Sequence, residues 1–198
     1  AYEDANKNIK IIANISNDSI TLDDGNIIEA NRGIIGTLGE KEVKNEEVVQ
    51  SNIIEGSENE IITSTSKCND GGIVIGGRTD SNDIDLGNGV KVKGPGALII
   101  RYGIDGNVKW KKIIENCNEI EGIVETSDGG IVAVGSFNSN ISLEKGINLS
   151  SKGYYDGLII KYDNNGELEW ATSIGGSDNE TIYSVIETED GGIVVGGD

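Results

Sequence analysis

Hydrophobic and polar positions follow one another in short runs, and the clearest run occurs three times. Asp-Gly-Gly followed by branched apolar residues is found at Asp70 (DGGIVIGG), Asp128 (DGGIVAVG) and Asp190 (DGGIVVGG), at spacings of 58 and 62 residues. A two-glycine turn before a short β-branched run indicates a hairpin, because glycine accepts the positive φ of tight turns. The spacing predicts a repeat architecture.

Four short strands are predicted in each repeat, and the last copy defines them best. They cover residues 158–162, 167–174, 181–188 and 193–195. Period-two spacing places Leu168, Trp170 and Ile174 on one face of the second of these strands. The Asp-Gly-Gly strand is predicted to be the last strand of its unit, so the chain begins and ends on such a strand. No window of useful length has helical spacing, so we expect almost no helix.

The repeat extends through the whole chain, although its first copy is degenerate. Tyr102 and Trp110 match Tyr162 and Trp170 at a spacing of 60 residues, and the segment that begins at Asn8 matches the one that begins at Gly130. We therefore expect one repeat body over residues 1–198. Its parts are a degenerate first repeat (1–68), a second repeat (69–127), a third repeat (128–189) and the start of a further unit (190–198).

A four-stranded unit of this length is typical of a propeller blade, whereas the coils of a β-solenoid are usually shorter. The sequence therefore predicts an all-β fold. Its architecture is expected to be a β-propeller-like array of four-stranded antiparallel blades with about three repeats.

The last copy resembles the β-propeller repeat of bacterial secreted and surface proteins. In that family a D-G-G strand, a G-x-x-D-x-x-L-I-K-x-D strand and a Trp strand recur. The resemblance covers residues 50–198 well and 8–49 less closely, and it implies a propeller architecture and an exported setting without implying an activity. In the middle copy, Gly96 and Gly103 replace two of the aspartates. The positions that fit in the last copy are Gly153, Asp156, Lys161, Asp163, Gly166 and Trp170.

Charge narrows the choice of partners. The net charge of −18, from 34 acidic and 16 basic residues, disfavours nucleic acid and anionic membranes, which are bound through Lys and Arg. No apolar run is long enough to insert into a bilayer. The sequence begins at Ala1 and contains no methionine, as after removal of a secretory signal, although a trimmed or excerpted chain would look the same. We expect an extracellular or cell-surface location.

Few residues of the sequence are candidates for catalysis or for metal binding. The chain has no histidine, which excludes histidine-based triads and metal sites and leaves carboxylates, lysine or tyrosine for catalysis. Glu60 and Glu180 recur at one repeat position, so turn or inter-blade structure is favoured for both. The stretch from Asp80 to Gly89 suggests calcium, but its spacing departs from the EF-hand loop and Lys91 occupies the closing position, so a solvated hairpin is favoured. No catalytic, cofactor-binding or metal residue is assigned, and calcium stays the alternative to having no cofactor.

Aromatic residues and cysteines are interpreted by whether they recur. Tyr154 and Tyr155 lie in a polar loop, do not recur, and are the candidates for exposed binding contacts. Cys68 and Cys117 lie outside the repeat pattern, which favours two isolated thiols over one disulfide. Core packing is expected for the recurring aromatic residues Tyr102, Tyr162, Trp110 and Trp170.

Three repeats cannot close a propeller ring, which generally needs four to eight blades. We therefore expect self-association with copies of the chain, or further blades of a longer chain, with a protein or carbohydrate ligand as another partner. The leading hypothesis is a non-enzymatic, exported structural or adhesive module. The alternatives are a subunit of an extracellular fibre and a carbohydrate-active enzyme that uses carboxylates at a propeller mouth.

Overall fold

The computed structural model describes residues 2–3, 9–15, 19–21, 27–29, 32–38 and 48–198, with side chains from Ile53 onward. These residues form strands and one 3-10 turn, Glu144–Gly146, without any α-helix. The predicted all-β class is confirmed. Within this part of the chain no helix suited to crossing a membrane occurs. The chain divides into a smaller unit (1–62 and 79–94) and a larger unit (63–78 and 95–198).

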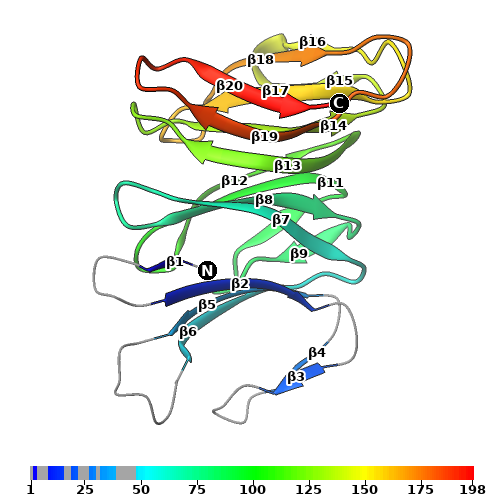
Figure 1. Cartoon of the computed structure of the whole chain (residues 1–198). Coiled ribbons are helices and arrows are strands. Elements are labelled where there is room, and N and C mark those ends of the chain that lie inside the picture. Colours follow the sequence, from blue (N-terminus) through cyan, green and yellow to red (C-terminus); the bar gives the residue numbers. More distant parts are fainter. Residues whose placement is uncertain (1, 4–8, 16–18, 22–26, 30–31, 39–47) are drawn as a thin grey trace. The chain divides into compact units, whose positions relative to one another are not determined.

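Three four-stranded antiparallel sheets share one strand order, in which each strand pairs with the next main strand along the chain (Figure 1). The predicted four-stranded sheets are thus confirmed. Sheet 1 contains β1 (Tyr2–Glu3), β2 (Ile9–Ile15), β5 (Arg32–Leu38) and β6 (Val48–Ile54). Sheet 2 contains β7 (Glu60–Lys67), β8 (Ile73–Thr79), β11 (Gly96–Tyr102) and β12 (Val108–Ile114). Sheet 3 contains β13 (Cys117–Glu125), β14 (Ile131–Phe137), β17 (Asp156–Tyr162) and β18 (Leu168–Ile174). A last pair consists of β19 (Ile182–Glu187) and β20 (Ile193–Gly197).

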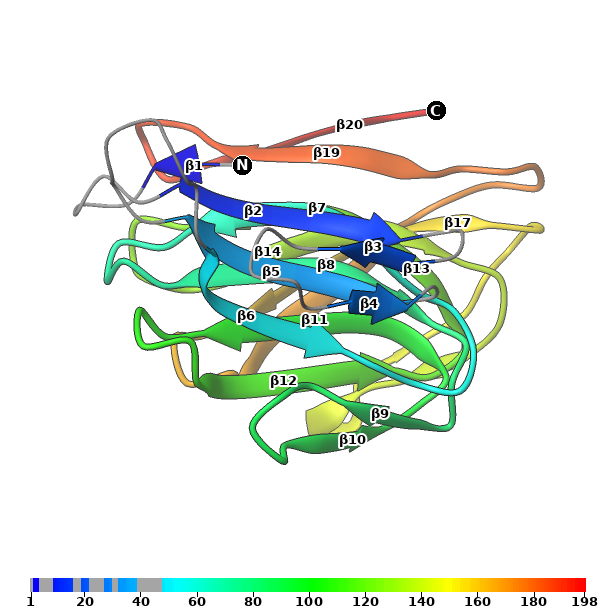
Figure 2. The ribbon, with the colours of Figure 1, turned by 90° about the horizontal axis from the view of Figure 1, so that it is seen from below.

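A small hairpin separates the second and third strands of each sheet. The stretch Asp80–Gly89 contributes to one of these hairpins (Figure 2), as predicted. There the Gly87 N–H donates to the Asp85 carboxylate at 2.9 Å, and Lys93 pairs with Asp83. The hairpins are β3 (Ser19–Thr21) with β4 (Ile27–Glu29), β9 (Asp83–Asp85) with β10 (Lys91–Lys93), and β15 (Ile141–Ser142) with β16 (Asn148–Leu149).

The Asp-Gly-Gly strand is the second strand of its sheet, and its predicted place as the last strand is wrong. The turn at Asp128 joins β13 to β14, and sheet 3 continues to β18 before pairing stops. The strands β17 and β18 therefore do not share a sheet with β19 and β20. A repeated sequence gives the cyclic order of its strands without marking where one sheet ends. That boundary lies in the loop after β18, where Gly175 lies against the buried Asp156 carboxylate.

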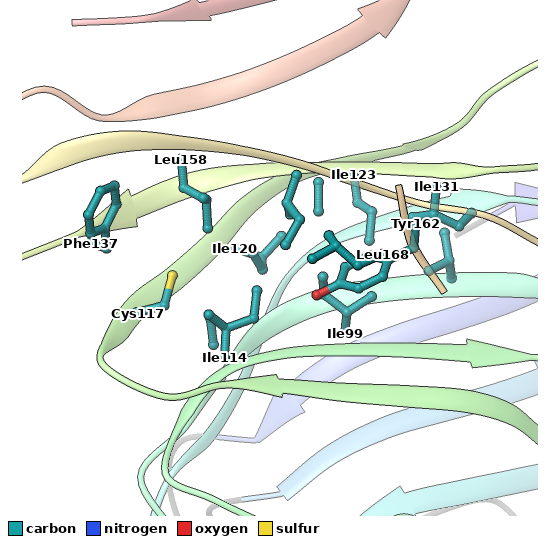
Figure 3. Packing of buried hydrophobic residues seen from close by; sticks show 14 of the residues in the cluster. Ile99, Ile114, Cys117, Ile120, Ile123, Ile131, Phe137, Leu158, Tyr162 and Leu168 are labelled. Carbon is teal, nitrogen blue, oxygen red and sulfur yellow. The ribbon is translucent and has the colours of Figure 1, made fainter. Parts of the chain in front are cut away.

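Within the larger unit, sheet 3 is apolar on both faces. One face packs against sheet 2 (Figure 3), and the other packs against the β19–β20 pair. This double burial explains why all seven residues of β14 are buried and why Ser136 is the only polar residue in that strand. The first contact joins Ile120, Ile131, Leu158, Ile160, Tyr162 and Leu168 to Val74, Ala97, Ile99 and Ile114. The second joins Val132, Val134 and Ile159 to Ile182 and Val185.

A β-bulge separates residues that the sequence pattern placed together. In the β17–β18 pair, Tyr162 is opposite Leu168 and Lys161 is opposite Trp170, so Glu169 is an inserted residue. The insertion turns Leu168 toward sheet 2 and Trp170 toward the other face, so their predicted common face is wrong. The same shift occurs in the β11–β12 pair between Arg101 and Tyr102.

Candidate association surface

The two tyrosines singled out from the sequence differ in their surroundings. Tyr154 is 78% exposed, the largest exposed fraction among the exposed large hydrophobic side chains of the described residues. Tyr155 is half-buried, and its carbonyl accepts the Glu180 N–H at 2.9 Å. The exposed-contact assignment therefore suits Tyr154 better than Tyr155.

The recurring glutamates hold turns, as favoured from their recurrence. Glu180 accepts the Gly176 N–H at 2.7 Å. Glu60 is buried in the smaller unit and accepts the Thr79 hydroxyl at 3.0 Å. Burial raises the pKa of Glu60, against the opposing effect of hydrogen bonds from Ser81, Thr79 and the Gly56 backbone. Each glutamate thus stabilises its own loop.

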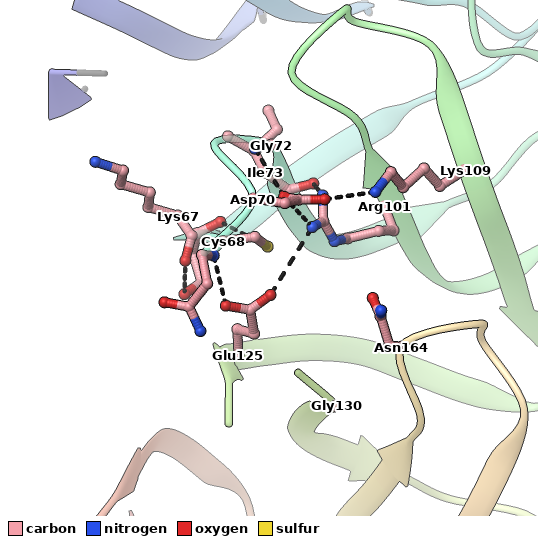
Figure 4. Close-up of polar contacts among 12 residues, drawn as sticks. Lys67, Cys68, Asp70, Gly72, Ile73, Arg101, Lys109, Glu125, Gly130 and Asn164 are labelled. Carbon is pink, nitrogen blue, oxygen red and sulfur yellow. Dashed lines mark hydrogen bonds and ion pairs between the residues drawn. The ribbon is translucent and has the colours of Figure 1, made fainter. Parts of the chain in front are cut away.

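Two of the Asp-Gly-Gly aspartates, Asp70 and Asp128, form ion pairs that were not predicted from the sequence, and Figure 4 shows those of Asp70. Asp70 accepts the Gly72 N–H at 2.9 Å and lies 2.5 Å from both the Arg101 guanidinium and the Lys109 ammonium. In the next repeat, Asp128 accepts the Gly130 N–H at 2.9 Å and pairs with Lys161. The signal was present in the sequence, because Arg101 and Lys161 occupy one repeat position.

A carboxylate from the following sheet completes each of these turns. Glu125, at the end of β13, accepts the Asn69 N–H at 2.7 Å and lies 3.8 Å from the buried Arg101 guanidinium. Glu187, at the end of β19, accepts the Ser127 N–H at 2.7 Å. Successive sheets of the larger unit are therefore linked by the same charged contact, repeated once.

The ion pairs move the pKa values of the turn aspartates. Burial alone would raise the pKa of Asp70, but hydrogen bonds from Lys109 and Arg101 outweigh it and hold that pKa well below the usual range. Hydrogen bonds from Lys161, Thr126 and the Gly130 N–H lower the pKa of Asp128 in the same way. Both carboxylates therefore stay ionised in the folded protein at pH values where unfolded aspartate takes up a proton.

Acid is expected to destabilise the fold through these two carboxylates. A lowered folded-state pKa contributes stability above the unfolded pKa of about 4, and this contribution is lost as pH falls from there toward the folded pKa. Urea denaturation between pH 6 and pH 2 should show a falling free energy of unfolding, with a shallower fall in the double variant Asp70→Asn/Asp128→Asn. Equal slopes in the two proteins would contradict this assignment.

The two tryptophans occupy one repeat position and have different surroundings. Trp110 is half-buried, its ring centroid lies 5.8 Å from that of Tyr162, and its Nε1–H donates to the Asn164 carbonyl at 3.1 Å. Trp170 is 37% exposed, so its predicted core position is wrong, whereas Tyr102 and Tyr162 are buried as predicted. The reason is the neighbouring sheet: sheet 3 covers Trp110 with its third and fourth strands, and the β19–β20 pair has only two strands.

Apolar residues around Trp170 are exposed at positions that are buried in the preceding repeat. Ile114 is 3% exposed and its counterpart Ile174 is 51% exposed. Val132 is fully buried and its counterpart Val194 is 51% exposed. We call this set the open face. It has two parts: Trp170 and Ile174 of β18, on the side of sheet 3 that packs against the β19–β20 pair, and Ile186 of β19 and Val194 of β20, on the opposite side of that pair.

A hollow of about 300 Å³ lies between the end of β12 and the β15–β16 hairpin. The Lys112 ammonium lies 5.3 Å from the centroid of the Tyr162 ring and pairs with Glu144 at its rim. This ion pair occupies two of the polar side chains that line the hollow. Its lining residues are Lys112, Ile113, Ile114, Glu115, Ser142, Leu143, Glu144 and Tyr162.

Both cysteines are free and buried, in agreement with the favoured interpretation of isolated thiols. Burial raises the pKa of the Cys68 and Cys117 thiols to about 12, so neither is a reactive thiolate at neutral pH. Among the residues that the structure describes, no group of three or more acidic or cysteine side chains is placed to hold a metal ion.

In comparisons with known proteins, no family model and no curated protein matches this chain. The likeness to a propeller repeat therefore rests on the motifs of the sequence, and it enters below as part of a proposal.

Proposed function

We propose that this chain is a non-enzymatic, exported structural or adhesive module built from β-propeller-like repeats, and that it associates with further repeats or copies of itself through the open face. The observation that carries the proposal is the exposure of Ile174 and Val194, whose counterparts Ile114 and Val132 are buried under the next sheet. Exposed apolar residues at positions that are buried elsewhere in the same repeat commonly mark an interaction site.

Two further features support this proposal. Asp70 and Asp128 form ion pairs within their own sheets, and Glu125 of sheet 3 accepts a hydrogen bond from the Asn69 N–H of sheet 2, so all three carboxylates are engaged in the fold. Among the described residues β20 is hydrogen-bonded to β19 alone, and a strand edge of this kind is a template for pairing with another strand.

A fibre subunit is the second candidate, because the contact is expected to be heterologous. The surface that covers Val132 consists of the inward residues Ile182 and Val185, whereas Val194 lies on the other face of the same strand pair. Two different surfaces would therefore meet when the contact is repeated. Heterologous contacts generate rings when they close and filaments when they do not.

Association through the open face predicts a mass that increases with concentration. We expect light scattering during size-exclusion chromatography to show oligomers of the unmodified chain and to show monomers of Ile174→Lys, because a buried lysine would lose its hydration. The matched control is Ile104→Lys. Ile104 lies in the β11–β12 turn with 56% of its side chain exposed, so this variant should associate like the unmodified chain. If the unmodified chain stays monomeric at every concentration measured, the proposal is refuted.

A further inference from the structure

We propose that the hollow between β12 and the β15–β16 hairpin binds one neutral sugar unit of a glycan, held by Lys112, Glu115 and Glu144. This inference goes beyond the proposed association and does not rest on it, because the hollow shares no residue with the open face. It follows from comparing this part of the larger unit with the corresponding part of the smaller unit.

The two units have corresponding residues at this place. Glu55 and Glu115 each follow the last residue of the fourth strand of a sheet, β6 in the smaller unit and β12 in the larger unit. Asp85 and Ser142 each follow the buried isoleucine of a small hairpin. The contact between strand and hairpin can therefore be compared directly in the two units.

The smaller unit closes the gap between strand and hairpin, whereas the larger unit leaves it open. The Glu55 N–H donates to the Asp85 carbonyl at 2.8 Å, and the Asp85 N–H donates to the Glu55 carbonyl at 2.7 Å. Among the described residues no backbone pair of this kind joins Glu115 to Ser142. Both residues instead line the hollow of about 300 Å³.

The turns after the two strands account for this difference. Only Glu115 and Asn116 separate β12 from β13, and Asn116 has a positive φ of 60°. This tight turn leads the chain directly from β12 into β13. The longer connection of residues 55–59 separates β6 from β7, so the chain there has room to run beside the hairpin before it turns.

The hairpin that forms the other wall of the hollow is anchored to the core. Its residues Leu143 and Ile147 pack against the cluster between sheets 2 and 3. The Leu143 N–H donates to the Ile147 carbonyl at 2.8 Å, which closes the turn that carries Glu144. The Lys145 ammonium donates to the Leu168 carbonyl of β18 at 2.5 Å. The hollow is therefore preformed, as is usual for ligand sites.

The charges around the hollow favour a neutral ligand. Lys112 is paired with Glu144, and Glu115 adds a second, exposed carboxylate to the lining. The two carboxylates would repel an anion. The Lys112 ammonium lies 5.3 Å from the centroid of the Tyr162 ring, so it already occupies the ring face that attracts cations and would repel a second one.

A sugar unit matches the remaining chemistry. A hydroxyl group both donates and accepts, so one sugar hydroxyl can accept from the Lys112 ammonium while its neighbour donates to the Glu144 carboxylate. Glu115 offers a further acceptor. The C–H face of a sugar ring is apolar and suits Ile113 and Leu143, which also line the hollow. Its volume of about 300 Å³ is at the lower end of the range for ligand pockets, which favours a single ring.

Saturation-transfer NMR on the full chain tests this inference. The probes are glucose, galactose, mannose and N-acetylglucosamine, each as the free sugar and as its methyl pyranoside. At least one methyl pyranoside should bind. The uronic acid and the 2-amino sugar of the same ring configuration should bind at least about tenfold more weakly, because each brings a charge toward a like charge. The amide signals of Glu115 and Ser142 should shift on binding, whereas those of Glu55 and Asp85 should not.

Two variants test the side chains of the hollow. Glu144→Gln keeps the shape of the side chain and should weaken binding at least about tenfold, as expected for loss of a charge-assisted hydrogen bond. Ser142→Phe places a large ring at the wall of the hollow and should abolish binding; Ser142 is exposed, so the fold is retained. The matched control is Asp83→Asn, which removes the ion pair with Lys93 from the β9–β10 hairpin and should leave binding unchanged.

Several outcomes would overturn the inference. Absence of binding by all the neutral probes, equal or tighter binding of a charged counterpart, or undiminished binding by either variant would each do so. Binding of the free sugars without their methyl pyranosides would overturn the assignment to a glycan. The Ile174→Lys chain should bind the probe like the unmodified chain, and the Ser142→Phe chain should form the same oligomers. If no probe binds while Ile174→Lys abolishes the oligomers, the inference fails and the proposed function stands.

Discussion

Replacing Arg101 with methionine is expected to lower the free energy of unfolding by about 3 to 5 kcal/mol, the range measured when one partner of a buried ion pair is removed. The guanidinium is 1% exposed, lies 2.5 Å from Asp70 and also bonds the Tyr102 carbonyl. Methionine fills a similar volume but removes the guanidinium that pairs with the buried Glu125 carboxylate. Urea denaturation at pH 7 measures the loss.

The matched control lies one repeat further along the chain. Lys161 occupies the position of Arg101, but its partners Asp128 and Glu169 are largely exposed. Solvent screens such pairs, so Lys161→Met should cost about 1 kcal/mol or less. The double variant Arg101→Met/Glu125→Gln should lose less than Arg101→Met alone, because no carboxylate is then left buried and unpaired. Similar losses for Arg101→Met and Lys161→Met would contradict the burial argument.

Replacing Tyr162 with alanine is expected to cost about 3 to 5 kcal/mol, as for other large buried aromatic residues. Tyr162 is buried between sheets 2 and 3, with Trp110 beside its ring and Lys112 above it. Its removal opens a cavity at the centre of this contact. The free energy of unfolding in urea measures the loss, and a loss below 1 kcal/mol would contradict this role of Tyr162.

A double-mutant cycle tests whether the two rings interact directly. Trp110→Ala and Tyr162→Ala should show a coupling energy of about 0.5 to 1.5 kcal/mol, the value typical of aromatic pairs. Trp170→Ala is the control at the same repeat position. Because Trp170 is partly exposed and belongs to the open face, its replacement should have little effect on unfolding of the isolated chain.

The strands and turns of this fold were predictable because their signals are local. Glycine pairs and β-branched runs located the hairpins, and the repeat spacing indicated that the same sheet would recur. The strand at which each sheet begins was not predictable, because a repeated pattern of four strands is the same whichever strand is taken as the first. The bulge at Glu169 was also missed, because one inserted residue reverses the faces of the residues around it without changing the local composition.

The candidate surface was harder to predict than the fold. Trp170 and Ile174 have the same sequence neighbourhood as Trp110 and Ile114, and their exposure depends on strands that lie elsewhere in space. The ion pairs of Asp70 and Asp128 join strands about 30 residues apart, and they could have been found by noting that Arg101 and Lys161 share a repeat position. Tyr154 was identified correctly as exposed because it lies in a polar loop.

The sequential strand order within each sheet also determines the order in which the protein can fold. Each sheet of the larger unit is a meander in which every strand pairs with the next main strand along the chain. A nascent chain can therefore complete sheet 3 before β19 and β20 have emerged, and these two strands then dock on a finished surface. All residues of β14 are buried and β14 pairs with a strand on each side, whereas β20 is mostly exposed and pairs with β19 alone among the described residues. We expect the amides of β20 to exchange with solvent first and those of β14 last.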